Sequence, residues 1–546
     1  MGISAMHITV GQYLIKRLHE AGVRQVFGIP GDYILDFYEQ LYEGPLEHVG
    51  TCTELGAGFA ADAYSRVHGL GVVCVTYCVG GFNCLNAVAG AYAEKSPLVV
   101  ICGAPGLLER GRSALLHHQV KDHRTQLDIF ARVTEAAVAL DDPARAPEAI
   151  DAVLDLCQRR KRPVYIELPR DMARARCMAP RRHKRTMPVS NPATLMEAAA
   201  DAVELLNQAK RPVILAGVEI HRFALQDALV RLVEQSGLPV AATLLGKSII
   251  REDHANYLGV YEGAMGQARV RRAVERSDCL LVLGAFMTDI NLGANTAQLD
   301  VDCTINASSE RISIRRHHYE DVRLDDFIAA LAKGLRRRRN IGKPRDRKAP
   351  PFRPKTGQPM TIRRLFNRID AFLTRNHMVI CDIGDSLFAA ADLIIRERTE
   401  FISPAYYTSM GFAIPAAVGA QMAAPKLRPL VIVGDGAFQM TGQELATIAR
   451  NKLNPIVIVL NNKGYTTERY IKDGAFNDIH EWAYHRMPDL LQAGWGAEVH
   501  TEDEFEAALM TASKNTSAFS ILNVHLDPWD RSNSLERLGQ SLASRK

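Results

Sequence analysis

The sharpest chemical signal in the sequence is an aspartate between two glycines at the end of an apolar run. Gly434, Asp435 and Gly436 follow the run PLVIV, which is typical of a buried strand. Small residues at the carboxyl end of such a strand let backbone N–H groups approach a diphosphate. A helix predicted to start near Gly442 would direct its positive end toward the same group. The carboxylate of Asp435 would then bind a divalent cation.

Two further oxygen donors follow at the next predicted strand. The run PIVIVL ends at Asn461 and Asn462, so the amide oxygen of Asn462 is expected beside Asp435, and the carbonyl of Gly464 can join them. Carboxylate, amide, carbonyl and phosphate oxygens together suit Mg²⁺, which prefers near-octahedral oxygen ligation. A GDG alone is often only a turn, but strand, GDG, helix, strand and NN in this order predict a metal and diphosphate site.

The elements that must position these residues are short, continuously apolar runs that alternate with helical stretches. Such runs occur in the first third (VRQVFGI, GVVCVTY, PLVVICG, PVYIEL), the middle (PVILAG, PVAATL, DCLLVLG) and the last third (MVICDIG, PLVIVGDG, PIVIVLNN). Continuous rather than alternating apolarity indicates parallel strands that are buried on both faces. We therefore predict an α/β fold with three doubly wound parallel-sheet domains, at 1–180, 190–335 and 360–546.

An internal repeat relates the first and last of these domains. In both, a Gly-Phe helix (GAGFAADAYSR and SMGFAIPAAVGA) precedes an apolar strand, a Gly-rich turn, a second helix and a proline-led strand. We infer two copies of one fold with an unlike domain between them. Basic, proline-containing stretches at 179–192 and 335–359 are expected to be the linkers.

The composition excludes several classes of protein. The 546 residues include 66 Lys+Arg and 61 Asp+Glu, a net charge of +5, which is slight for a protein that binds nucleic acid. The arginine-rich second linker is the one feature in favour of that class, and a solvated crossover explains it better. No apolar run approaches the ~20 residues that span a bilayer, and the N-terminus lacks a secretory signal pattern. With free cysteines expected in apolar runs, we predict a cytoplasmic enzyme without a membrane or nucleic-acid partner.

The GDG–NN segment resembles the thiamine diphosphate motif of the 2-oxo acid decarboxylase family, and the likeness extends along the whole chain. The resemblance implies that the first and last domains bind the pyrimidine and diphosphate ends of thiamine diphosphate, with Mg²⁺ on Asp435, Asn462 and Gly464. Because the family's active site lies between subunits, it also implies a homodimer or homotetramer. The implied cofactor contacts also include Asp385, Ser386, Ser409, Met410, Gly434, Gly436 and Ala437, with Met410 as the apolar prop of the cofactor. Ser409 departs from pyruvate decarboxylases, which carry histidine there.

Glu54, in CTELGAGFAADAYSR, matches the family's cofactor-activating glutamate. A carboxyl group beside the pyrimidine can share its proton and so help to deprotonate the thiazolium C2. Burial would supply the raised pKa that this exchange needs. Viewed alone, a glutamate at a helix start is more often a cap.

Four further residues resemble the decarboxylase-specific proton relay. Asp32 lies in FGIPGDYILDF, and His117 and His118 form the pair in LLHHQ, which acetolactate synthases lack. Two adjacent histidines could equally be a surface feature. Glu468, in NNKGYTTERY, matches the family's acid just past the metal loop, although it could be a helix-start residue.

The substrate is predicted from a difference to pyruvate-preferring members, which read GDSW where this chain has Leu387 after Ser386. An isobutyl group in place of an indole leaves room for acids larger than pyruvate, and Thr467 and Ile471 are expected to line the same pocket. AGAYAEKSP and GDGAFQMTG favour the phenylpyruvate and indolepyruvate branch, whereas Glu468 favours pyruvate- or branched-chain-type enzymes.

The sequence thus predicts a carboxy-lyase that converts a bulky 2-oxo acid, aromatic or branched, to the aldehyde and CO₂, with thiamine diphosphate as the electron sink. The alternatives are a thiamine diphosphate-dependent carboligase, a pyruvate decarboxylase, or a non-catalytic relative that kept the fold. A C-terminal turn and helix, in DPWDRSNSLERLGQSLASRK, could cover the site or lie on the surface.

Overall fold

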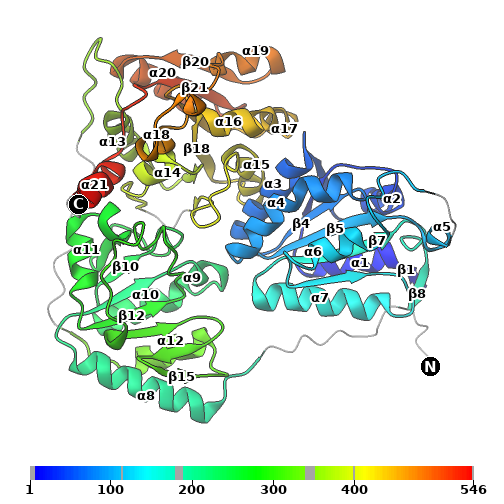
Figure 1. Cartoon of the computed structure of the whole chain (residues 1–546), viewed down its shortest axis with the longest axis horizontal. Helices are drawn as coiled ribbons and strands as arrows, with labels where there is room; N and C mark the ends of the chain where they lie inside the picture. The colour runs from blue at the N-terminus through cyan, green and yellow to red at the C-terminus, as the bar shows by residue number, and fades with distance from the viewer. Residues whose placement is uncertain (1–6, 112–114, 179–187, 339–350, 397–399, 544–546) are drawn as a thin grey trace. The chain divides into compact units, whose positions relative to one another are not determined.

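The computed structural model describes residues 7–111, 115–178, 188–338, 351–396 and 400–543 (Figure 1). The chain forms two compact units. Unit 1 comprises 1–187, 409–426 and 440–453, and unit 2 comprises 188–408, 427–439 and 454–546. The predicted linkers at 179–192 and 335–359 lie in part outside the described residues, as does the start of the N-terminus.

The first sheet is parallel throughout, as predicted. Its strand order is β3-β2-β4-β5-β7-β6, and β1 and β8 form a separate antiparallel pair. The strands of the sheet are β2 (Gln25–Gly28), β3 (Glu47–Gly50), β4 (Gly71–Val75), β5 (Leu98–Ala104), β6 (Ala136–Ala139) and β7 (Val164–Pro169), and the separate pair is β1 (His7–Thr9) and β8 (Arg176–Met178). Its helices are α1 (Val10–Glu20), α2 (Leu35–Glu43), α3 (Glu54–His68), α4 (Val79–Ala93), α5 (Leu107–Arg110), α6 (Thr125–Phe130) and α7 (Ala146–Arg160).

Both faces of this sheet are buried, which explains the continuous apolar runs. Successive side chains of a strand point to opposite faces. On β4, Val72 and Cys74 belong to the core formed with α1, α2 and α7, while Val73 and Val75 are equally buried on the other face. Helices α3 and α4 contact each other and strands of this sheet (Figure 1). The doubly wound fold class is therefore confirmed.

The last sheet repeats this topology. Its order β17-β16-β18-β19-β21-β20 matches the first sheet strand for strand, and all of its pairs are parallel. Its strands are β16 (His377–Cys381), β17 (Phe401–Ile402), β18 (Arg428–Gly434), β19 (Ile456–Asn461), β20 (Trp495–Val499) and β21 (Ser520–His525). The α-helices of this part are α13 (Ile362–Phe372), α14 (Asp385–Ala390), α15 (Ala413–Ala423), α16 (Asp435–Thr441), α17 (Leu445–Arg450), α18 (Thr466–Ile471), α19 (Met487–Leu491), α20 (Glu502–Lys514) and α21 (Asn533–Ala543). The repeat found in the sequence is thus a repeat of structure.

The central sheet differs, because it ends in two antiparallel strands that the apolar runs did not predict. Its order is β11-β10-β9-β12-β13-β14-β15, with β14 and β15 antiparallel to their neighbours. Its strands are β9 (Pro212–Ala216), β10 (Val240–Ala242), β11 (Tyr257–Val260), β12 (Cys279–Leu283), β13 (Thr304–Ala307), β14 (Ile312–Ile314) and β15 (His317–Tyr319). Its helices are α8 (Pro192–Gln208), α9 (Glu219–Arg222), α10 (Gln226–Ser236), α11 (Ala268–Glu275) and α12 (Leu324–Gly334).

The two Gly-Phe helices of the repeat, α3 and α15, pack against each other within unit 1. The rings of Phe59 and Phe412 meet edge to face at 5.5 Å between centroids. A Cβ at Gly419 would lie 1.8 Å from the carbonyl oxygen of Ala60, so this close approach requires glycine. The segment that begins α3 is thereby fixed in unit 1.

The predicted start of the helix after the GDG motif was wrong. The helix expected to start near Gly442 begins at Asp435, because β18 turns directly into α16, and Gly442 starts a short 3₁₀ turn (Gly442–Glu444) before α17. The three glycines in GDGAFQMTG made this helix hard to recognise, since glycine disfavours helix interiors and Gly436 lies within α16.

Candidate functional site

Asp435 lies at the junction of β18 and α16 and is almost completely buried, with 1% of its surface exposed. Its Oδ1 accepts the backbone N–H of Gly436 at 2.8 Å, and its Oδ2 accepts that of Gly464 at 3.1 Å. Burial nevertheless raises the pKa of Asp435 to about 6, against the effect of these hydrogen bonds. Among the described residues no cationic side chain is hydrogen-bonded to Asp435, and such a buried carboxylate is suited to receive a metal ion.

Asn462 follows β19, the strand paired with β18, and its Oδ1 is buried without a hydrogen-bond partner among the described residues. Arg469 holds the loop by donating to the carbonyls of Asn462 at 3.1 Å and of Lys463 at 2.7 Å. Gly464 has φ +144°, and a Cβ there would lie 2.0 Å from the carbonyl oxygen of Asn477, so the loop requires glycine. The unpartnered amide oxygen and the buried carboxylate are oxygen donors of the kind that Mg²⁺ binds, so these residues fit the predicted ion.

The adjacent strand β16 leads to a second buried aspartate, Asp385, at the point where the strand order reverses. Such switch points are where open α/β sheets bind ligands. Oδ2 of Asp385 accepts the backbone N–H of Ser532 at 2.7 Å, while its Oδ1 has no hydrogen-bond partner among the described residues. Burial raises its pKa to about 6. Asp385 therefore keeps one carboxylate oxygen available for a ligand.

The small residues around these carboxylates have different surroundings. A Cβ at Gly434 would meet nothing within 4 Å, so this turn faces open space, whereas one at Gly436 would contact the ring of Tyr465 at 2.4 Å. Ala437 is buried. Ser386 is also buried, and its hydroxyl donates to the carbonyl of Asp382 at 2.8 Å.

Of the residues predicted to line the substrate pocket, Thr467 lies near the turn before Leu387, whereas Ile471 points to solvent. A Cβ at Gly384 would lie 3.6 Å from Oγ1 of Thr467, so α18 reaches the turn that leads into α14. Leu387, on α14, is fully buried in the apolar core of the last sheet. Glu468 is exposed, and so is Ile471, with 76% of its surface accessible.

Glu54 is the first residue of α3, but it does not cap the helix. The N-cap is Thr53, whose side chain accepts the backbone N–H of Gly56 at 3.0 Å. The half-buried carboxylate of Glu54 instead accepts from Nδ2 of Asn83, on α4, at 2.6 Å. Glu54 is therefore not the N-cap of α3. Its carboxylate is instead oriented by Asn83 of the neighbouring helix α4.

The turn before Glu54 is held by a buried residue that the sequence analysis missed. Glu444, which is completely buried, accepts the backbone N–H groups of Cys52 at 3.1 Å and Thr53 at 3.0 Å. Its carboxylate also accepts from the hydroxyls of Thr53 and Thr447. In the sequence, Glu444 is only an acidic residue near a predicted helix start. It comes to hold the turn before Glu54 because residues 440–453 pack in unit 1.

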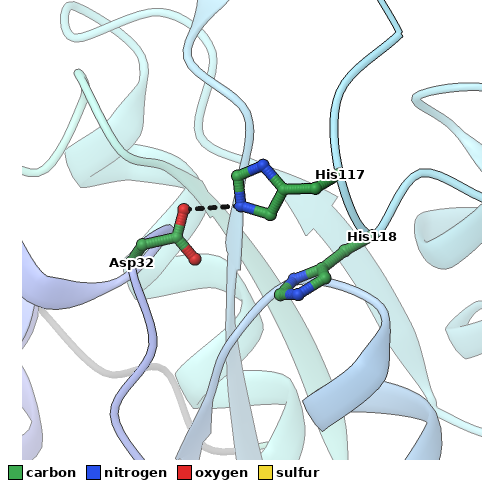
Figure 2. A group of neighbouring side chains, drawn as sticks. All are labelled: Asp32, His117 and His118. Atoms are coloured by element: carbon green, nitrogen blue, oxygen red, sulfur yellow. Dashed lines mark hydrogen bonds and ion pairs between the residues drawn. The ribbon is translucent and has the colours of Figure 1, made fainter.

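Figure 2 shows that Asp32 and the two histidines form one cluster. Oδ2 of Asp32, on the turn after β2, lies 2.8 Å from Nε2 of His117. The rings of His117 and His118 meet at 4.7 Å, and Nδ1 of His118 is buried without a hydrogen-bond partner in the described part of the chain. A carboxylate in hydrogen-bond contact with an imidazole can hold a proton and pass it on.

Tyr33, a second residue missed from the sequence, supports this cluster. Its ring stacks on His117 at 4.7 Å between centroids, and its hydroxyl donates to the carbonyl of His117 at 3.2 Å. His118 has φ +66°, an unfavourable conformation for a residue with a side chain, which the surrounding contacts maintain. The turn that carries Asp32 needs Gly31, because a Cβ there would lie 2.5 Å from Cβ of Thr76.

Ser409 and Met410 lie before α15 in unit 1. The hydroxyl of Ser409 accepts from Nδ2 of Asn86 at 2.7 Å. The carbonyl of the next glycine, Gly411, accepts from the hydroxyl of Thr441 at 2.7 Å. Both predicted cofactor residues are half-buried.

Comparison with protein families identifies the class of protein. Three models of thiamine pyrophosphate enzymes match in order: the N-terminal TPP binding domain at 8–129, the central domain at 199–335 and the C-terminal TPP binding domain at 382–524. The chain belongs to this family.

Similar proteins narrow the class further. An indole-3-pyruvate decarboxylase of Azospirillum brasilense is 37% identical over 97% of this chain and 98% of its own length. A pyruvate decarboxylase of Aspergillus fumigatus is 34% identical over 98% of this chain and 97% of its own, and an alpha-keto-acid decarboxylase of Mycobacterium avium is 34% identical over 95% and 94%. The protein is a thiamine diphosphate-dependent 2-oxo acid decarboxylase. In the described residues we find no helix long and apolar enough to cross a membrane.

Proposed function

We propose that the protein removes CO₂ from a 2-oxo acid larger than pyruvate, aromatic or branched-chain, and releases the aldehyde. The contact between Asp32 and His117, beside His118, carries the non-oxidative decarboxylase part of this proposal, because these groups can deliver the proton that the aldehyde carbon needs. Leu387 supports the larger substrate, since pyruvate-preferring members place a tryptophan there. The similarity to an indole-3-pyruvate decarboxylase points in the same direction.

We propose Mg²⁺ as the ion held by Asp435, Asn462 and the carbonyl of Gly464. The buried carboxylate of Asp435 and the unpartnered Oδ1 of Asn462 support this assignment. Gly434 leaves room for a diphosphate beside them, with Asp385, Ser386 and Ala437 near the same edge of the sheet. When bound, thiamine diphosphate supplies a nucleophilic carbon and an acceptor for the electrons that CO₂ leaves behind.

We propose that the residues of the chain position the cofactor and the substrate and transfer protons. Glu54, oriented by Asn83, would exchange a proton with the pyrimidine ring. Asp32, His117, His118 and Glu468 would hold and move protons on the substrate side. Met410 would support the cofactor, with Ser409 near its diphosphate, and Thr467 and Ile471 would line the pocket with Leu387.

We further propose that the protein is a homodimer or homotetramer in the cytoplasm, with Glu54 of one chain and Asp435 of another completing each site. We also propose that each chain has three domains, at 1–180, 190–335 and 360–546. Light scattering tests the assembly: an active species with the mass of a single chain would contradict it.

A substrate panel tests the reaction and the substrate together. Pyruvate, branched-chain acids, phenylpyruvate and indolepyruvate would be supplied with thiamine diphosphate and Mg²⁺, and the aldehyde measured by a coupled dehydrogenase. We expect kcat/KM to be larger for at least one bulky acid than for pyruvate. A preference for pyruvate would overturn the substrate assignment, and formation of acyloins rather than aldehydes would favour the carboligase.

A further inference from the structure

A cluster of two histidines and one glutamate lies at the carboxyl ends of β20 and β21, within unit 2, with a second glutamate, Glu481, beside it. The proposed reaction does not use this cluster. Glu498 is on β20, His500 follows the end of β20, and His525 is the last residue of β21. β20 and β21 lie side by side (Figure 1) and pair in parallel, with Val499 beside Val524. Their carboxyl ends therefore bring Glu498, His500 and His525 close together.

One carboxylate oxygen of Glu498 lies near a ring nitrogen of each histidine. Oε1 of Glu498 lies 3.0 Å from Nε2 of His525 and 3.9 Å from Nε2 of His500. The two imidazole rings are stacked 4.1 Å apart, and one ligand atom from each of the three residues lies within 4.8 Å of the others. Ligands around a tetrahedral zinc ion are about 3.4 Å apart, given metal–ligand distances near 2.1 Å. Because the two ring planes are only 9° apart, one imidazole must turn out of the stack before both nitrogens can reach one ion, and the exposed side chain of His500 has room for this rotation.

The surroundings of His525 provide a second, independent observation. Its other ring nitrogen, Nδ1, lies 3.4 Å from Oε1 of Glu481. Glu481 is itself held by Nδ2 of Asn461 at 3.0 Å and by Nζ of Lys463 at 3.4 Å. A histidine that binds a metal through one nitrogen usually directs the other to an anchored carboxylate, which fixes the ring and raises its basicity. Nδ1 of His525 has such a carboxylate partner.

The site is also open on one side. His500, His525, Glu481 and Lys463 help to line a cavity of ≈ 880 Å³. An ion bound by His500, His525 and Glu498 would keep a coordination position for water or another small ligand. Two imidazole nitrogens favour zinc-class transition ions over Mg²⁺, which prefers oxygen alone.

We propose that Glu498, His500 and His525 bind a divalent transition ion of the zinc class, with Glu481 orienting His525. This site is separate in residues and in donor chemistry from the one proposed for Mg²⁺, so it stands whether or not the proposed substrate is correct.

The test uses the full-length protein, freed of metal by a chelator and then kept in excess Mg²⁺ to fill the oxygen site. Co²⁺ is titrated and followed by visible absorption, and Zn²⁺ binding is measured by equilibrium dialysis. We expect one Zn²⁺ per chain and a Co²⁺ spectrum of low coordination number with nitrogen ligands. His500→Ala, His525→Ala and Glu498→Gln should abolish this binding, and Glu481→Gln should weaken it roughly 10- to 100-fold.

Two controls separate this site from others. His317→Ala removes an exposed histidine of β15 and should leave binding unchanged, and so should Asp435→Asn, which disables the proposed magnesium site. Glu498 and His500 are largely exposed, so their variants should fold, and Glu498→Gln keeps the shape of the side chain. Absence of Zn²⁺ binding by the unaltered protein would overturn the proposal, as would undiminished binding by His500→Ala and Glu498→Gln.

Discussion

Oε1 of Glu444 accepts the backbone N–H of Thr53 at 3.0 Å, directly before the proposed cofactor-activating Glu54. Residues far apart in the chain are thus joined within unit 1, and the turn that carries Glu54 depends on a buried carboxylate. Four donors of the turn and α17 share this carboxylate: the backbone N–H groups of Cys52 and Thr53 and the hydroxyls of Thr53 and Thr447.

Replacing Glu444 should therefore destabilise the protein and misplace Glu54. Glu444→Ala leaves buried donors unpaired, which costs about 2 kcal/mol, and Glu444→Gln should cost less because one acceptor oxygen remains. We expect the midpoint of urea unfolding to fall in this order, together with turnover. Glu43→Ala, at an exposed glutamate of α2, is the matched control. Equal midpoints for Glu444→Ala and Glu43→Ala would rule out the anchoring role.

Asp32→Asn should affect product release without affecting activation of the cofactor. The substitution removes the charge that faces Nε2 of His117, so turnover should fall by roughly 10²- to 10⁴-fold. Proton exchange at the thiazolium C2, measured by NMR after rapid quench, should be unchanged. Glu54→Gln should instead slow both. Asp36→Asn, which alters a surface ion pair with Arg174, is the control. If Asp32→Asn slowed C2 exchange as much as Glu54→Gln does, the division of roles would be incorrect.

Leu387→Trp should shift preference toward pyruvate. The larger side chain would fill the space proposed for the substrate's side chain, and we expect the ratio of kcat/KM for pyruvate to that for phenylpyruvate to rise at least about tenfold. Because Leu387 is fully buried, overpacking should also cost about 1–3 kcal/mol. Leu393→Trp, at another buried leucine of the same core, controls for that cost. An equal shift in both variants would argue against a specific pocket at Leu387.

The sequence predicted the sheets well because strands buried on both faces must be apolar throughout. Val72, Val73, Cys74 and Val75 illustrate this, since neighbouring residues pack on opposite helical layers. Strands at sheet edges gave weaker signals: β3 (Glu47–Gly50) and β20 (Trp495–Val499) contain polar residues and were missed. Edge strands need only one apolar face, so their pattern is less distinctive.

The local metal motif was also predictable, because the loop around Gly464 depends on glycine and on short-range contacts with Asp435. The partners of Glu54 were not. Asn83 and Glu444 come from other helices, and nothing in their immediate sequence distinguishes them from ordinary helix residues. Tyr33 likewise gains its role only when the loop with His117 folds over it.

The buried carboxyl group of Glu262 should make the free energy of unfolding depend on pH. It is completely buried, its Oε2 has no hydrogen-bond partner among the described residues, and burial together with the charge of Asp392 raises its pKa from 4.5 to about 8. Between these values the folded protein retains a proton that the unfolded chain has released. Stability should therefore fall as the pH rises through this window, by roughly 1.4 kcal/mol per pH unit from this group.

Glu262→Gln should remove that component. Urea midpoints measured from pH 5 to pH 8 should decline less steeply for the variant than for the unaltered protein, and the two should differ most at the alkaline end. Parallel pH profiles would mean that Glu262 does not hold its proton in the folded state.

The most direct test of the whole account is a calorimetric titration of the metal-free protein with thiamine diphosphate, with and without Mg²⁺. We predict saturable binding of one cofactor per chain that requires Mg²⁺ and is lost in Asp435→Asn. Binding of equal strength without the ion or in that variant would contradict the proposed site, and no uptake of the cofactor with Mg²⁺ present would contradict the account as a whole.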